Sequence, residues 1–505
     1  MRNVLLIVTA ATVLLFPREI AHAQTATTPT IDPRITKLVA SISEERLQQL
    51  LQKLSSYKTR NTCSDPSSAD GVGAARQWIY DELKRTSPKL QVSFDSYQLP
   101  TIPRCTGGPF ELRNVMAVLP GKTPRRIYVS GHYDSVSLGG GGQQASNSGA
   151  GGRAEGAAGA VAAGAGSATD ARSAQMRPGA APQAPGETPA PNQQARPPAR
   201  DANVPAPGAN DDGSGTVLSM ELARVFAESG IEFDATLVFM TVAGEEQGLV
   251  GATQHAKKAK ADNTPIQAWF NNDIVGGSHG GDGSIDGATI RIYSEGPEDS
   301  PSRSLAMFTR RIGAEYVPSH IVRLIARPDR FSRGGDHSAL NAEGFAAIGF
   351  RESRENYSKQ HGPGDTIDGV DFHYLAQNAR VNAAAMATLA LAPPPPVVAR
   401  RPTGTAATAT TANRLMPTID RRTSGYDAHL RWEASAGAAG YVVFWRNAWE
   451  PDWQHEISVG NVTEYTFPRM NIDDWVFGVA AVDAAGHEST VSAYVAPPRA
   501  EGSGG

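Results

Sequence analysis

The stretch Ile127-Tyr128-Val129-Ser130-Gly131-His132-Tyr133-Asp134 decides the fold, because it joins a short apolar run directly to two polar side chains. The run from Ile127 to Ser130 ends at a glycine, which is typical of a buried strand. Similar runs at Thr236 to Val242 and Ala268 to Asn271 are also followed by acidic residues. We expect further strands at Asn114 to Leu119 and Ala346 to Phe350.

Helical stretches alternate with these strands. Apolar residues repeat at helical spacing from Val217 to Phe226, Ser300-Pro301 has the form of a helix start, and Phe372 to Leu391 is rich in Ala. The alternation predicts an α/β fold with a mostly parallel sheet sandwiched by helices. Sites in such sheets form at the carboxyl ends of the strands. Polar residues that directly follow the strands are therefore candidates for chemistry.

Five segments place an Asp, Glu or His where a metal ligand would be useful. They are Gly131-His132-Tyr133-Asp134, Asn210-Asp211-Asp212-Gly213-Ser214-Gly215, Ala243-Gly244-Glu245-Glu246, Asn272-Asp273-Ile274-Val275-Gly276 and Gln360-His361-Gly362. Carboxylates and imidazoles without thiolates suit zinc, with cobalt or manganese as substitutes. Two metal ions and one further carboxylate can together supply the activated water, the polarised carbonyl and the base that peptide hydrolysis needs.

As an ordered set, these segments resemble the co-catalytic zinc peptidases, which include secreted bacterial leucine aminopeptidases and, more distantly, glutamate carboxypeptidase and glutaminyl cyclase. The resemblance covers residues 35 to 392 apart from a low-complexity insertion, and it implies a zinc exopeptidase-like fold with two zinc ions per chain. By this resemblance Asp211 bridges both ions, and Glu245 is the catalytic general base. The remaining metal ligands are then His132 and Asp273 on one ion, and Glu246 and His361 on the other.

The resemblance also assigns residues around the ligands. Asp134 is expected to orient the imidazole of His132, and Asp212 to cap a helix or to lie behind the ligands. His337, in Gly335-Asp336-His337-Ser338, matches a family segment that lines the pocket, and it is expected to have a structural or substrate-side role instead of binding metal. Several family members polarise the scissile carbonyl with a Tyr, whereas Gln360 precedes His361 here, so Tyr357 is the candidate for that role. A cis peptide bond is expected between Asp211 and Asp212.

The charge balance and the first residues indicate compartment and partners. The 505 residues carry a formal net charge of -4 with both signs interspersed, which argues against a nucleic-acid partner. Arg2, the apolar run Val4 to Phe16 and the sequence Ala21-His22-Ala23 predict a signal peptide over residues 1–23, with no membrane span after cleavage. We therefore expect a secreted or periplasmic protein, in which Cys63 and Cys105, the only cysteines, form a disulfide.

Composition divides the rest of the chain. The expected peptidase domain covers residues 24–392, and it is interrupted at about 138–208 by Gly, Ala, Pro and Gln-rich sequence predicted to be disordered. A Pro- and Ala-rich linker is expected at 393–414. Alternating apolar residues at 415–497 predict a small all-β sandwich that resembles a fibronectin type III module. Its expected role is adhesion, spacing, or contact with a surface or carbohydrate.

Two classes of function fit the sequence. The first is a zinc-dependent aminopeptidase acting on peptides or proteins with a free N-terminus. The second is a non-catalytic binding ectodomain of the transferrin-receptor type, and it is disfavoured because degenerate members usually lose ligands or the base. Within the fold, glutaminyl cyclisation is the alternative reaction, and it works with one zinc ion instead of two.

Overall fold

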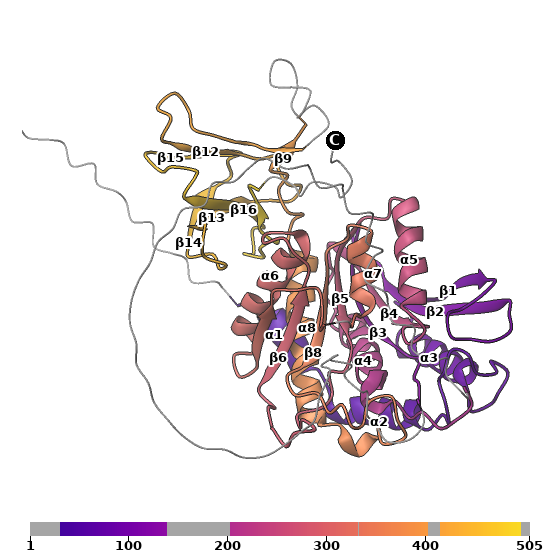
Figure 1. Ribbon diagram of the computed structural model, residues 1–505. Helices are drawn as coiled ribbons and strands as arrows, with labels where there is room; N and C mark the ends of the chain where they lie inside the picture. The colour runs from indigo at the N-terminus through magenta and orange to yellow at the C-terminus, as the bar shows by residue number, and fades with distance from the viewer. Residues whose placement is uncertain (1–30, 139–201, 332, 402–414, 496–505) are drawn as a thin grey trace, which may run out of the picture.

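The structure is a computed structural model that describes residues 31–138, 202–331, 333–401 and 415–495 (Figure 1). The expected signal peptide and most of the expected disordered insertion lie outside these residues. No helix in the described ranges is both long and apolar enough to cross a bilayer.

The predicted α/β sheet is present and has eight strands in the order β1-β2-β4-β3-β5-β8-β6-β7. Its centre is parallel: β3 pairs in parallel with β4 and β5, and β5 with β8. The pairs β1·β2, β2·β4 and β6·β8 are antiparallel, because hairpin-type and returning connections are tolerated toward the edges of large mixed sheets. The strands are β1 (Gln91–Leu99), β2 (Phe110–Leu119), β3 (Thr123–His132), β4 (Ala235–Val242), β5 (Ile266–Asn272), β6 (Thr289–Ser294), β7 (Ile321–Ile325) and β8 (Ala347–Glu352).

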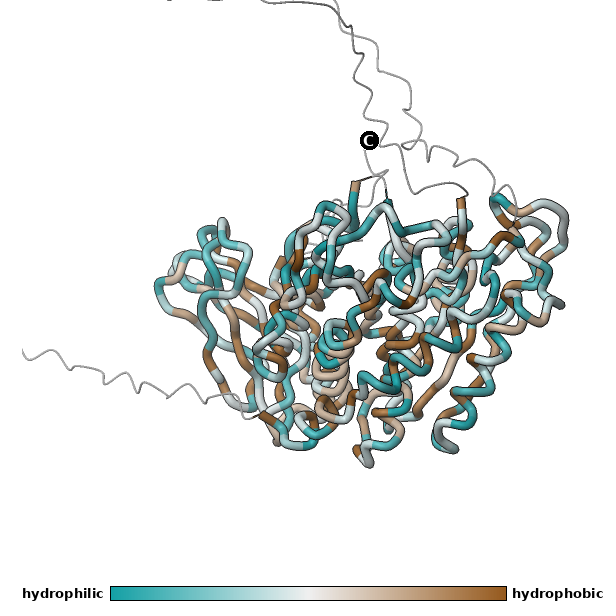
Figure 2. The backbone as a smooth tube through the Cα atoms, turned by 90° about the horizontal axis from the view of Figure 1, so that it is seen from below, coloured by the Kyte–Doolittle hydropathy of each residue, from teal (hydrophilic) through white to brown (hydrophobic). Residues whose placement is uncertain are grey.

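Helices cover both faces of this sheet, as the alternating side chains of its central strands require. Ile127 and Val129 of β3 belong to a large core cluster shared with α1, α2, α3, α4, α6 and α8. Tyr128, between them, belongs to a second cluster that includes residues of α5 and α7. Figure 2 shows hydrophobic residues along these interior segments. The helices are α1 (Pro33–Ala40), α2 (Glu44–Ser55), α3 (Val72–Thr86), α4 (Ser214–Glu228), α5 (Val250–Ala261), α6 (Pro301–Tyr316), α7 (Asp336–Ala342) and α8 (Phe372–Leu391).

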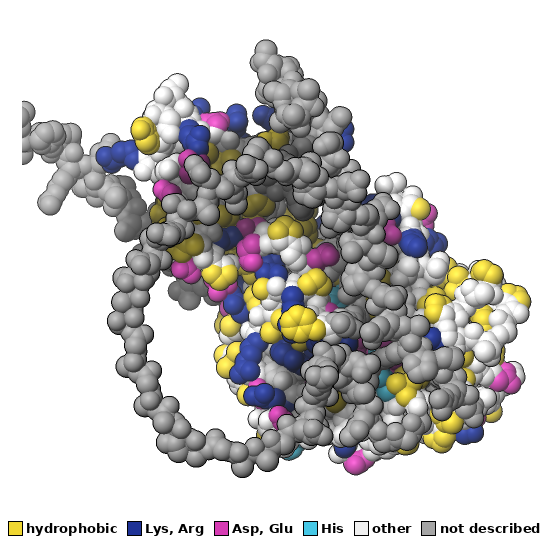
Figure 3. Space-filling view, viewed as in Figure 1, with side chains coloured by type: hydrophobic (Ala, Val, Ile, Leu, Met, Phe, Trp, Pro, Cys, Tyr) yellow, Lys and Arg dark blue, Asp and Glu magenta, His cyan; other side chains and the backbone are white. Residues whose placement is uncertain are grey.

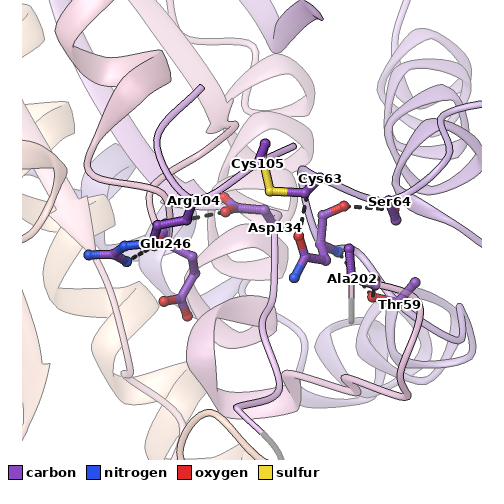
Figure 4. The surroundings of a disulfide bond; sticks show 9 residues. Thr59, Cys63, Ser64, Arg104, Cys105, Asp134, Ala202 and Glu246 are labelled. Carbon is purple, nitrogen blue, oxygen red and sulfur yellow. Dashed lines mark hydrogen bonds between the residues drawn. A yellow bond between two sulfur atoms is a disulfide. The ribbon is translucent and has the colours of Figure 1, made fainter. Parts of the chain in front are cut away.

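The predicted disulfide between Cys63 and Cys105 is present. It links two loops that precede and follow β1. One loop continues from Arg60, and the other carries Arg104, whose guanidinium donates a hydrogen bond to the main-chain oxygen of Glu246 (Figure 4). The crosslink therefore holds together loops that both contact the segments with the candidate ligands.

The C-terminal part forms antiparallel sheets, a three-stranded one in the order β11-β12-β15 and a four-stranded one in the order β14-β13-β16-β17. Apolar residues of both sheets share one core, including Leu430, Tyr441 and Val479. Part of the expected linker belongs to this region, since β9 pairs with β10. The strands are β9 (Ala399–Arg400), β10 (Met416–Pro417), β11 (Ile419–Asp420), β12 (Ala428–Arg431), β13 (Gly440–Asn447), β14 (His455–Gly460), β15 (Glu464–Phe467), β16 (Trp475–Val482) and β17 (Ser492–Ala493).

Candidate metal centre

The polar residues that follow β3, β4 and β5 meet at the carboxyl edge of the sheet, where the parallel topology predicts them. His132 is the last residue of β3, Glu245 and Glu246 follow β4, and Asp273 follows β5. Nε2 of His132 lies 3.8 Å from Oδ1 of Asp273 and 4.0 Å from Oε2 of Glu245. His132 and Asp273 are buried, with exposed side-chain fractions of 3% or less, whereas Glu245 is partly buried at 13%.

Asp211 lies between the two candidate histidines. Its Oδ1 is 3.4 Å from Nε2 of His132, and its Oδ2 is 3.1 Å from Nε2 of His361. The same Nε2 of His361 is 3.2 Å from Oε1 of Glu246. Asp211, Glu246 and His361 together form one group whose ligand atoms all lie within 4.8 Å of one another. Each carboxylate oxygen of Asp211 therefore faces a different imidazole, which is the arrangement that a bridging ligand requires.

Asp212 also comes within 4.8 Å of His132 and Asp273, but its carboxylate is occupied by the protein. Its Oδ1 accepts the amide of Gly215 in the first turn of α4 and the amide of Ile274, and its Oδ2 accepts the amide of His132. These bonds hold the ligand-bearing segments against one another. We therefore assign Asp212 to the support of the site and not to the metal. The peptide bond between Asp211 and Asp212 is cis, as predicted.

Two further carboxylates position the ligand segments from behind. Asp134 accepts the amides of Glu245 and Glu246, at 3.2 and 3.3 Å. Nδ1 of His132 lies 3.1 Å from the main-chain oxygen of Asp134 and 3.6 Å from its carboxylate, so the carbonyl makes the closer contact with the imidazole. Asp365, which the sequence reasoning missed, accepts the amides of Asn210 and Asp211.

The electrostatics of this edge suit bound cations. Burial, together with the carboxylates of Asp273 and Glu246, raises the pKa of Glu245 well above its usual range. Burial lowers the pKa of His361, but the carboxylates of Glu246 and Asp211 outweigh it and raise that pKa to about 10. The buried Nε2 of His132 and Oδ2 of Asp211 have no hydrogen-bond partner within the described ranges. Because these are nitrogen and oxygen donors without thiolate, the residues present fit zinc.

Arg351 is a second residue that sequence reasoning missed. Its guanidinium bonds both oxygens of Asp273, with Nη1 2.8 Å from Oδ1. Burial raises the pKa of Asp273, but Arg351 and His132 outweigh it and keep that pKa below its usual range. Arg351 thus holds Asp273 ionised, as a ligand must be. Arg351 directly follows the strand predicted at Ala346 to Phe350, but an Arg is no metal ligand, and its pairing with Asp273 has no signal in the sequence.

Arg60 is a fully buried cation beneath the centre. Its guanidinium donates to the main-chain oxygen of Tyr133, directly after His132, and to those of Pro207 and Gly208, shortly before Asp211. Burial lowers the pKa of Arg60 to about 10, and the carboxylates of Asp365, Asp134, Asp212 and Asp211 oppose this shift. One side chain therefore joins two ligand-bearing segments and offsets part of their negative charge.

We expect Arg60→Met to lower the free energy of unfolding by about 3–5 kcal/mol, because it leaves the main-chain oxygens of Tyr133, Pro207 and Gly208 without their donor and removes a buried cation near several carboxylates. Affinity for divalent metal should fall as well, and competition with a chelator would measure it. Arg125→Met is the matched control. Arg125 bonds the main-chain oxygen of Ala392 near the start of β3, away from the centre. Unchanged metal affinity in Arg60→Met would contradict the proposed link to the ligands.

Three further side chains lie around the candidate centre: His337 and Tyr357, which the sequence singled out, and Asp336. His337 is buried, and its Nε2 contacts the main-chain oxygen of Pro328 at 2.7 Å, so it supports a loop. Tyr357 is 54% exposed, and its ring packs against the guanidinium of Arg333. Asp336 carries a buried carboxyl with no hydrogen-bond partner among the described residues, and burial raises its pKa to about 8.

The fold and this edge together define a class: an α/β protein with a candidate metal centre lined by carboxylates and imidazoles. The family model for peptidase family M28 matches residues 197–386. A probable zinc metalloprotease of Leptosphaeria maculans is 32% identical over 492 residues, covering 90% of this chain and 95% of that protein. One from Pyricularia oryzae is 30% identical over 502 residues, covering 91% and 84%.

The chain belongs to peptidase family M28. This confirms the predicted resemblance at the level of the family. Among solved structures, the LapA aminopeptidase of Legionella pneumophila matches with 16% identity and a TM-score of 0.48, covering 73% of this chain and 78% of that one.

Proposed function

We propose that this protein is a two-zinc aminopeptidase. The observation that supports the proposal most directly is the position of Asp211, whose two carboxylate oxygens face His132 and His361 separately. Asp273 and Glu246 complete the two sets of ligands. Bound zinc would activate a water molecule and polarise the scissile carbonyl.

Glu245 is the proposed general base. Its side chain is 13% exposed and its Oε2 lies 4.0 Å from Nε2 of His132, so Glu245 borders the proposed ligands without being enclosed by them. The backbone N–H of Glu245 donates a hydrogen bond to the carboxylate of Asp134, and this bond fixes the turn that carries Glu245. In this position Glu245 can accept a proton from the attacking water and donate it to the leaving amine.

The same carboxylates favour a substrate with a free amino terminus. Glu245 and Asp273 are placed to accept charge-assisted hydrogen bonds from an ammonium group, and such bonds contribute about 1.5–3 kcal/mol each. Arg351 already bonds both oxygens of Asp273, so Glu245 carries most of this role. Exopeptidase activity from the N-terminus follows.

We expect acetylation of the N-terminus to lower kcat/KM at least about tenfold, because one charge-assisted bond is lost. The measurement compares one peptide with free and acetylated amino ends, with zinc content determined on the same sample. Equal cleavage, or release of residues from the carboxyl end, would contradict the aminopeptidase assignment. One zinc ion per chain and cyclisation of N-terminal Gln would favour the glutaminyl cyclase alternative, and metal binding without turnover would favour the binding ectodomain.

Two further features of the chain are its proposed amino-terminal export segment and its C-terminal module. We propose cleavage after Ala23 and export, which the disulfide between Cys63 and Cys105 supports, because such bonds persist in oxidising compartments. The shared core of the C-terminal antiparallel sheets supports the fibronectin type III-like assignment. Sequencing the amino terminus of the exported protein would test the cleavage site.

A further inference from the structure

Arg333 lies beside the candidate metal centre and contacts the residue that precedes a candidate ligand. Its Nη2 donates to Oε1 of Gln360 at 3.2 Å, and Gln360 directly precedes the candidate ligand His361. The loop of Arg333 continues into Gly335, where a Cβ atom would lie 3.3 Å from Oδ2 of Asp273. Arg333 therefore belongs to a loop that approaches a candidate ligand of each metal ion.

The neighbouring arginines differ from Arg333 in their partners. Arg330 and Arg291 each bond an oxygen of the Glu355 carboxylate, at 2.8 and 2.7 Å, and Arg351 bonds Asp273. The nearest carboxylate oxygen to Arg333 in an ion pair of the described residues is Oε2 of Glu355, at 3.6 Å, and Arg330 already bonds that oxygen. The only side-chain hydrogen bond that Arg333 makes with a described residue goes to the neutral amide of Gln360.

Among the described residues, the positive charge of Arg333 is therefore balanced only in part, by the shared carboxylate of Glu355. Burial and the guanidinium groups of Arg330 and Arg351 lower the pKa of Arg333, although Glu355 and Asp211 oppose that shift. The side chain is 20% exposed, so a ligand can reach it from solvent. Figure 3 shows Lys and Arg side chains gathered beside hydrophobic ones over β6 and β8.

We propose that Arg333 recognises a carboxylate group of the peptide substrate. A guanidinium suits this task because its planar fork matches the two oxygens of a carboxylate. The centroid of the Tyr357 ring lies 5.7 Å from the guanidinium carbon of Arg333, so the ring packs against one face of the guanidinium. The carboxylate is either the C-terminus of a short peptide or the side chain of Asp or Glu. This proposal rests on the aminopeptidase function and narrows its substrates to peptides carrying an anionic group close to the scissile bond.

The test compares kcat/KM within three pairs of substrates that differ only in one carboxylate. Leu-Ala and its amide vary the C-terminus, Leu-Glu-amide and Leu-Gln-amide vary the second side chain, and Glu-Leu-amide and Gln-Leu-amide vary the first. We expect at least about a tenfold preference for the carboxylate in one pair, which identifies its source. Arg333→Gln should abolish that preference, and Arg333→Lys should retain part of it, because the charge remains without the fork.

Arg323→Gln is the matched control, since it removes an equal charge from an exposed side chain on β7. It should leave the preference unchanged, and zinc content should match the wild type in all variants. Calorimetric binding of the same pairs to the zinc-loaded Glu245→Gln protein, with and without Arg333→Gln, gives a second measurement that needs no turnover. No carboxylate preference in either measurement, or a preference that survives Arg333→Gln, would overturn the proposal. Failure to release the first residue of Leu-Gln-amide would instead count against the aminopeptidase function.

Discussion

Replacing Glu245 by Gln is expected to lower kcat by about 10²–10⁴-fold while both zinc ions stay bound, because the substitution removes only the general base. Gln keeps the size of the side chain, and the backbone N–H of residue 245 still donates its hydrogen bond to the carboxylate of Asp134. The turn that carries the neighbouring proposed ligand Glu246 should therefore keep its shape. Turnover with saturating peptide, together with elemental analysis for zinc, checks both halves of this expectation.

The control for this variant is Glu232→Gln, which makes the same chemical change at an exposed position before β4. It should retain wild-type turnover. If Glu245→Gln retained it too, Glu245 would not be the base. If zinc were lost instead, Glu245 would have to be counted among the ligands.

Replacing Asp211 by Asn is expected to lose most bound zinc and with it essentially all turnover. Asp211 offers one carboxylate oxygen to each half of the centre, and an amide offers only one oxygen and no negative charge. Loss of a single side chain thus weakens both metal sites, whereas loss of His132 or His361 should weaken mainly one. Zinc content after dialysis against a weak chelator measures the difference.

Asp262→Asn serves as the control, because Asp262 is exposed at the end of α5 and pairs only with Lys258 among the described residues. It should bind two zinc ions as the wild type does. Full zinc occupancy in Asp211→Asn would exclude the bridging role. Circular dichroism of the variant would separate metal loss from unfolding.

The sequence alone predicted five of the eight strands of the large sheet, three of the helices, and the class of chemistry. The apolar run at Thr236 to Val242 and the Ala-rich stretch at Phe372 to Leu391 correspond to β4 and α8, because local periodicity and flanking polar residues set such elements. The polar residues placed after β3, β4 and β5 converge, because the carboxyl ends of parallel strands lie along one edge. The disulfide followed from there being only two cysteines.

The residues that hold the proposed ligands in place could not be predicted, because they make contacts between distant parts of the chain. Arg60 meets Gly208 across 148 positions, Arg351 meets Asp273 across 78, and Asp365 meets Asp211 across 154. No periodicity or motif links such pairs, because each residue alone resembles an ordinary surface charge. The antiparallel strand pairs on either side of the parallel centre were missed for the same reason, since pairing direction depends on the path of the connections.

The sequence by itself determined several of the strands and helices, β4 and α8 among them, and the residue types that gather at one edge of the sheet, which suit a zinc peptidase. Only the tertiary structure decided that Asp212 supports the site through backbone amides, that Arg351 keeps Asp273 ionised, and that Arg333 has no carboxylate bonded to it among the described residues. The physical reason is that composition and spacing act locally, whereas the balance of buried charges is set by side chains that only the folded chain brings within a few ångströms of one another.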